Sequence, residues 1–180
     1  MRGIVLVEGL SDRAAVEALA RRRGRDLDAE GVSVVPMGGA QAIGRFLDRY
    51  GPRGLDLGLA GLCDAGEEDE FRRGLERAGL GTDLDRAGME RLGFYICVAD
   101  LEDELIRALG AAKVEEIAEA QGELGSFRTF QKQPAQQERN HEQQLRRWLG
   151  NRKIRYAPLL VDALDPAGVP RPLDLVLAHL

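Results

Sequence analysis

Apolar residues form two kinds of pattern along the first hundred positions of the chain. Short continuous apolar runs alternate with segments in which apolar residues recur every three or four positions. The first pattern is typical of buried parallel strands and the second of amphipathic helices. The patterns predict strands at 4–7, 31–35, 57–62 and 92–99, and helices at 11–23, at 41–50 and in an acidic stretch ending near 78. Strands that alternate with helices predict a parallel sheet with helices on both faces.

The second half of the chain has a different pattern. Its segments read as helical or irregular, with helix candidates at 101–109, 114–120, 142–149, 154–163 and 173–180. The sequence therefore predicts an α/β fold with a Rossmann-like parallel sheet of about four strands, flanking helices and a helical C-terminal extension. We expect a core at 1–110 and an extension, packed on that core, at 111–180.

Composition narrows the class of protein. Hydrophobic residues make up 44% and charged residues 31% of the chain, as in ordinary globular proteins. The chain has no apolar run approaching the roughly 18 residues of a membrane span, and its first residues lead directly into a strand. Cys63 and Cys97 lie in apolar runs, which favours buried thiols in a cytoplasmic protein. A net charge of −5 argues against nucleic-acid binding by charge alone.

Acidic residues follow three of the predicted strands. Glu8 ends the first strand, Asp64 the third and Asp100 the fourth, with Glu102 close behind. The carboxyl ends of parallel strands share one edge of the sheet, so these side chains are expected to converge. Neighbouring carboxylates either take up protons or bind hard cations such as Mg²⁺ or Mn²⁺. Each acid alone is also an ordinary helix cap, so the prediction depends on the joint pattern.

Two further acids join this set. Asp12 lies in the first turn of the helix after Glu8, for which Ser11 is the expected N-cap. The stretch at 64–70 holds five acids in seven positions, and after Asp64 itself Glu67 is the better ligand candidate. The predicted metal ligands are therefore Glu8, Asp12, Asp64, Glu67, Asp100 and Glu102.

These motifs resemble those of a known family. Val-Leu-Val-Glu-Gly-Leu-Ser-Asp at 5–12 resembles the first motif of TOPRIM domains, and Pro-Met-Gly-Gly at 36–39 resembles their glycine turn. Leu-Cys-Asp-Ala-Gly-Glu at 62–67 is similar to the third-strand motif. Asp-Leu-Glu-Asp-Glu-Leu-Ile at 100–106 and Arg-Lys-Ile-Arg-Tyr-Ala at 152–157 resemble the OLD (overcoming lysogenization defect) branch of TOPRIM nucleases.

The resemblance implies a nuclease that uses one or two Mg²⁺ or Mn²⁺ ions to cleave DNA or RNA, with DNA favoured as the substrate and DNA repair or phage defence as the role. Glu8 and Asp12 would bind metal or act as acid and base, and Lys153 would steady the scissile phosphate. The expected catalytic residues are thus Glu8, Asp12 and Lys153.

The sequence departs from the family pattern in two respects. Gly66 stands where the usual second aspartate of Asp-x-Asp is expected. The chain also has no Gly-x-x-x-x-Gly-Lys-Ser/Thr loop, although full-length OLD proteins resemble ATPases fused to TOPRIM. The expected protein is a stand-alone TOPRIM module, or one that meets an ATPase in trans.

Basic residues gather in the segment 126–156, which has eight lysines or arginines and only two acids. Aromatic residues are interleaved with them, a pattern found in nucleic-acid-binding surfaces and also in a core with a basic rim. The candidate nucleic-acid-binding residues are Arg128, Lys132, Arg146, Arg147, Arg152 and Arg155.

Three functions agree with these patterns. The leading hypothesis is a metal-dependent nuclease. The alternative is a catalytically degenerate TOPRIM module that binds nucleic acid or nucleotide, or partners an ATPase in trans; Gly66 favours it. The third is nucleotidyl transfer, as in primases. The oligomeric state stays open.

Overall fold

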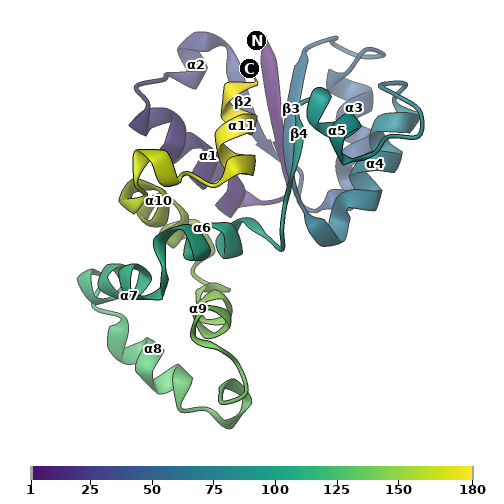
Figure 1. Ribbon diagram of the computed structural model, residues 1–180. Coiled ribbons are helices and arrows are strands. Elements are labelled where there is room, and N and C mark those ends of the chain that lie inside the picture. The colour runs from purple at the N-terminus through teal and green to yellow at the C-terminus, as the bar shows by residue number, and fades with distance from the viewer. Residues whose placement is uncertain (1, 180) are drawn as a thin grey trace.

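A four-stranded parallel sheet forms the centre of the fold (Figure 1). The computed structural model describes residues 2–179, and its strands lie in the order β2-β1-β3-β4 with every pairing parallel. Their bounds are β1 (Gly3–Val7), β2 (Val32–Pro36), β3 (Gly58–Asp64) and β4 (Phe94–Cys97). The predicted parallel sheet with flanking helices is confirmed.

Helices follow each strand and fill the second half of the chain. The first half holds α1 (Leu10–Arg22), α2 (Leu27–Glu30), η1 (Ala40–Ala42), α3 (Ile43–Tyr50), η2 (Ala65–Glu67), α4 (Glu68–Arg77) and α5 (Arg86–Arg91). The second half holds α6 (Leu101–Leu109), α7 (Ala111–Ala120), α8 (Leu124–Gln131), η3 (Pro134–Gln136), α9 (His141–Leu149), α10 (Lys153–Ala163), η4 (Pro166–Gly168) and α11 (Arg171–Ala178).

Some predicted bounds needed correction. Helices α2 and α8 were not anticipated, and α5 lies partly in a segment expected to be a loop. Helix α5 forms because the side chain of Asp85 accepts a hydrogen bond from the Gly88 N–H and caps its first turn. The strand expected at 92–99 is shorter, because the chain leaves the sheet after Cys97. Leu180 lies outside the described residues.

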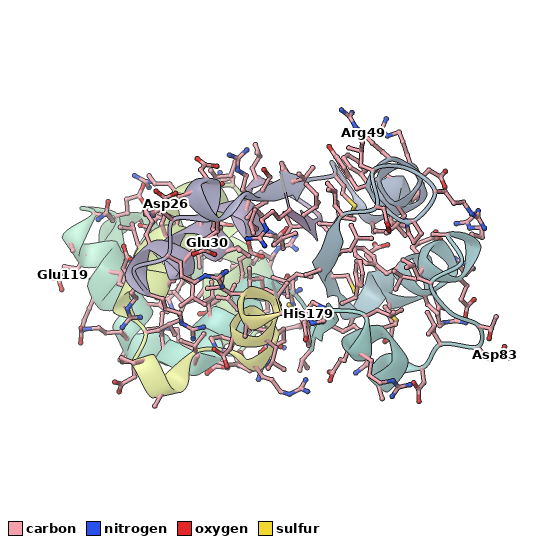
Figure 2. The ribbon with its side chains drawn as sticks, turned by 90° about the horizontal axis from the view of Figure 1, so that it is seen from above. Asp26, Glu30, Arg49, Asp83, Glu119 and His179 are labelled. Atoms are coloured by element: carbon pink, nitrogen blue, oxygen red, sulfur yellow. The ribbon has the colours of Figure 1, made fainter. Side chains whose placement is uncertain are left out.

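Alternating side chains of β1 face two separate cores. Ile4 and Leu6 pack with α3 and α4, whereas Val5 and Val7 pack with α1 and the C-terminal helices. Figure 2 views the molecule from above and shows helices on both sides of the sheet, with Arg49 and Asp83 on one side and Glu119 on the other. The continuous apolar run of β1 is thereby explained, since both of its faces are buried.

Helices α7, α8 and α9 project beyond the carboxyl edge of the sheet (Figure 1). After them, α10 returns to pack along α1, and α11 packs on β4. Phe127, Trp148 and Tyr156 are buried and pack in sequence, with ring centroids 5.4 and 5.6 Å apart. These aromatic rings are part of the hydrophobic core and are not exposed as a stacking surface for bases. Of the two interpretations of the segment 126–156, their burial agrees with a core that has a basic rim.

No helix within residues 2–179 is both long enough and apolar enough to cross a membrane.

Candidate functional site

The ends of β1 and β3 are joined through a carboxylate. Oε1 of Glu8 accepts a hydrogen bond of 2.8 Å from the backbone N–H of Asp64. Two acids that are 56 positions apart in the sequence are therefore neighbours at the carboxyl edge of the sheet. This is the convergence expected from parallel strands.

Asp12 extends this pair from the first turn of α1. Its Oδ2 accepts a hydrogen bond of 2.8 Å from the N–H of Gly9, the residue that caps the helix. The prediction of Ser11 as N-cap is wrong, because α1 begins at Leu10 and Ser11 lies inside it. The bond to Gly9 holds Asp12 over the turn that follows Glu8.

The pKa values of these three acids show how crowded the edge is. Burial raises the pKa of Asp64 to about 8, and repulsion from nearby carboxylates adds to the shift. Those carboxylates belong to Glu8, Asp12, Asp100 and Glu102. Burial likewise raises the pKa of Asp12 to about 6 and that of Glu8 above its ordinary value. Shifts of this kind cluster at functional sites.

Helix α6 and its N-cap supply three more buried acids. Glu104 pairs with Arg107 of the same helix, and the other two are each paired with a cation from the C-terminal half. Asp100 caps α6 through the Asp103 N–H at 2.8 Å and accepts from Nε of Arg146, on α9, at 2.8 Å. Oε2 of Glu102 lies 3.0 Å from Nζ of Lys153, at the start of α10. Helices α9 and α10 thus carry positive charge to the acidic edge.

The donor chemistry fits a hard divalent cation, since the set consists of carboxylates that raise one another's pKa. Within residues 2–179, however, no three acidic, histidine or cysteine side chains lie close enough together to hold an ion. Three of these carboxylates already have partners: Glu8 and Asp12 accept hydrogen bonds from backbone N–H groups, and Glu102 accepts one from Lys153.

Gly66, where an aspartate was expected, lies in η2 and is exposed. A Cβ placed on it would meet no atom within 4 Å. A side chain is thus tolerated there, and the missing carboxylate is not explained by crowding. Its neighbour Glu67 lines a pocket of about 650 Å³ together with Glu8.

The same pocket contains a cation that the sequence patterns did not single out. Arg45, on α3, lines it beside the glycine turn, where Gly38 and Gly39 have positive φ angles of 78° and 122°. The Arg45 guanidinium lies 5.1 Å from the ring centroid of Phe46. The sequence feature that could have identified Arg45 is its position, because it is the first arginine after the glycine turn.

The six candidate nucleic-acid-binding residues divide into two groups. Most pair with acids: Arg128 with Glu115, Arg146 with Asp100, and both Arg152 and Arg155 with Glu123. Lys132 and Arg147 are exposed, and no ion pair is found for either among the described residues. These last two are the cations most available to a phosphate backbone.

A larger groove, of about 900 Å³, runs along β2 at the edge of the sheet. None of the six predicted metal ligands lines this groove, so the acidic edge is the better candidate for a metal-dependent active site.

The first part of the chain matches a known protein-family model. Residues 1–64 match the model described as "Overcoming lysogenization defect protein-like, TOPRIM domain". Over its first 64 residues the chain is therefore similar to an OLD-like TOPRIM domain. The matched segment spans β1 to β3, and so includes Glu8, Asp12 and Asp64.

Solved structures resemble the whole chain, including the helices beyond the matched segment. The C-terminal region of the Xanthomonas campestris pv. campestris OLD protein is 26% identical, with a TM-score of 0.77, over 99% of this chain and 93% of that one. The C-terminal region of the Burkholderia pseudomallei OLD protein is 22% identical, with a TM-score of 0.74, over 99% and 96%. No curated protein matches the chain.

TOPRIM domains generally serve metal-dependent nucleotidyl transfer or nucleic-acid cleavage and bind divalent ions such as Mg²⁺. This chain carries its acids at the carboxyl edge of the sheet, and its C-terminal helices add Lys153 and Arg146.

Proposed function

We propose that this TOPRIM domain uses one or two Mg²⁺ or Mn²⁺ ions to hydrolyse phosphodiester bonds of nucleic acid. DNA is the favoured substrate. The supporting observation is the hydrogen bond from the Asp64 N–H to Glu8, which joins the carboxyl ends of β1 and β3. Lys153 interacts electrostatically with Glu8, and Glu102 with Asp64. Carboxylates that can hold a metal ion and a cation that can neutralise a phosphoryl oxygen therefore occur at the same edge, and both are needed for phosphodiester hydrolysis.

Each group has a role that its position supports. Glu8, Asp12, Asp64, Glu67, Asp100 and Glu102 are the residues that would hold the ions. A bound divalent ion supplies charge neutralisation for the phosphate and lowers the pKa of water. Asp12, with its pKa of about 6, can accept a proton near neutral pH. Burial lowers the pKa of Lys153, but the attraction and hydrogen bond of Glu102, together with the charges of Asp100 and Asp12, raise it above its ordinary value. Lys153 therefore keeps its charge and neutralises a phosphoryl oxygen.

Nicking of supercoiled plasmid with Mg²⁺ or Mn²⁺ tests this proposal. We expect Glu8→Gln and Asp64→Asn to reduce nicking by about a hundredfold or more. Glu119→Gln is the matched control, because Glu119 is an exposed acid on α7, at the outer end of the molecule (Figure 2), and is not one of the predicted metal ligands. Equal activity in wild type and all variants would place the reaction elsewhere.

A second candidate function is a non-catalytic module that binds nucleic acid or nucleotide, or partners an ATPase in trans. Two observations favour this second function: Gly66 stands where an aspartate was expected, and the acids already bond N–H groups and cations of the protein. Calorimetric titration with Mn²⁺ separates the two candidates: the nuclease binds the ion and loses binding in Asp64→Asn, whereas the degenerate module binds nucleic acid without it.

A further inference from the structure

Exposed apolar side chains gather around the acidic edge. Among the described residues, four large hydrophobic side chains are exposed, and three of them lie at this edge. Leu10 follows β1, Val98 follows β4, and Ile154 stands next to Lys153. The fourth, Leu55, lies before β3 at the opposite edge. Isolated exposed apolar residues need no explanation, but a group around a polar site indicates a contact surface.

Two of these side chains share a pocket. Leu10 at the start of α1 and Ile154 on α10 line a pocket of about 700 Å³, and they are 54% and 56% exposed. The two helices pack side by side on one face of the sheet (Figure 1). The pocket lies between the start of α1 and the start of α10, and the residues that link α9 to α10 complete its lining.

The lining of this pocket is positive. It includes Arg152, Lys153 and Arg155 and contains no acid. Arg152 and Arg155 share one carboxylate, that of Glu123, so a cationic excess remains. A pocket that is apolar at its walls and basic at its rim, next to the residue assigned to the phosphate, matches a nucleotide: the base meets the apolar groups and the phosphates meet the cations.

We propose that the pocket between α1 and α10 receives an unpaired base of the nucleic-acid strand whose phosphate lies at Lys153. This inference rests on the proposed function for the position of the phosphate. A base within a duplex must be unpaired and unstacked before it can reach Leu10 and Ile154, whereas a single strand, a flap or a mismatch presents its base without most of that cost. The substrate class is therefore nucleic acid with unpaired nucleotides at the cleavage site.

Binding without cleavage tests the proposal. DNA oligonucleotides that carry 2-aminopurine, as a single strand, in a flap or in a full duplex, are titrated with the protein in the absence of divalent ions. We expect wild type to bind the unpaired forms about tenfold more tightly than the duplex and to change the fluorescence of the probe. Leu10→Ser combined with Ile154→Ser is expected to reduce that preference to about twofold, with the melting temperature unchanged because both side chains are exposed.

Leu55→Ser is the matched control, because Leu55 is equally exposed but lies at the other edge. It should keep the wild-type preference. Equal binding of paired and unpaired DNA by wild type, or an unchanged preference in the double variant, overturns the proposal. A double variant that alters only the elution volume in size exclusion also overturns it, since the surface is then a protein contact. Absence of nicking in a protein that still prefers unpaired bases contradicts the proposed function but leaves the binding of an unpaired base by this pocket supported.

Discussion

Nζ of Lys153 lies 3.0 Å from Oε2 of Glu102, linking the first residue of α10 to the buried face of α6. The ion pair connects a residue proposed to hold a metal ion with one proposed to hold the phosphate. Its consequence is competition, because Lys153 and a divalent cation are attracted to the same carboxylate.

Replacing Lys153 by Met is expected to separate metal binding from cleavage. Loss of the competing ammonium should tighten Mn²⁺ binding about threefold to tenfold, while plasmid nicking falls about a hundredfold. Calorimetry and a nicking assay measure the two effects. Lys113→Met is the control, since Lys113 forms an exposed ion pair on α7. Parallel loss of both properties in K153M would mean that Lys153 only supports the fold.

Replacing Gly66 by Asp is expected to strengthen the metal site. The position has room for a side chain and adjoins Asp64 and Glu67, so the added carboxylate should tighten Mg²⁺ binding about tenfold. Gly125→Asp on α8 is the control, because a Cβ there also meets nothing within 4 Å. Unchanged Mg²⁺ affinity in G66D, with the fold intact, would show that this position does not face the ion.

The metal-free protein is expected to lose stability as the pH rises. The folded-state pKa of Asp64 is about 8 and that of Asp12 about 6, both above the ordinary value of about 4. The folded state therefore binds more protons than the unfolded state, and its free energy of unfolding falls between about pH 4 and pH 8.

Asp64→Asn removes the larger part of this dependence. At pH 8 without divalent ions the variant should be more stable than wild type by about 1 kcal/mol, or about 2–4 °C in melting temperature, after allowing for partial exposure of the site. Thermal melts at pH 5 and pH 8 measure the difference. A variant less stable than wild type at pH 8 would contradict the raised pKa.

Arg45→Gln is expected to weaken substrate binding about threefold to tenfold, because Arg45 lines the pocket with Glu8 and Glu67. Arg49→Gln is a close control: Arg49 lies on the same helix and stacks on Tyr50 at 5.3 Å, as Arg45 stacks on Phe46, but it does not line that pocket. Affinity for a labelled oligonucleotide is the measurement. Equal losses in both variants would indicate a nonspecific charge effect.

Lys132 and Arg147 are expected to contact the phosphate backbone. Replacing both by Gln should reduce the slope of log affinity against log salt by about 2. Arg53 and Arg91, exposed cations at the opposite edge of the sheet, provide the control pair. A salt slope that responds only to the control pair would move the interface to the other end of the molecule.

The sequence by itself determined the sheet and the composition of its acidic edge. Continuous apolar runs such as 4–7 specify strands buried on both faces, and parallel strands place the residues that follow them at one edge. The placement of Glu8 and Asp64 at one edge follows from the pattern, whereas their direct contact depends on the pairing of β1 with β3.

Tertiary structure decided which partner each of those side chains has. Arg146 and Lys153 reach Asp100 and Glu102 from helices that lie 46 and 51 positions further along the chain. The aromatic residues of the C-terminal half are core because the projecting helices pack on one another, a relation that their spacing did not reveal. Hydrophobic periodicity specifies which face of an element is buried, whereas the pairing of charges depends on the angles at which elements pack, and no local pattern records those angles.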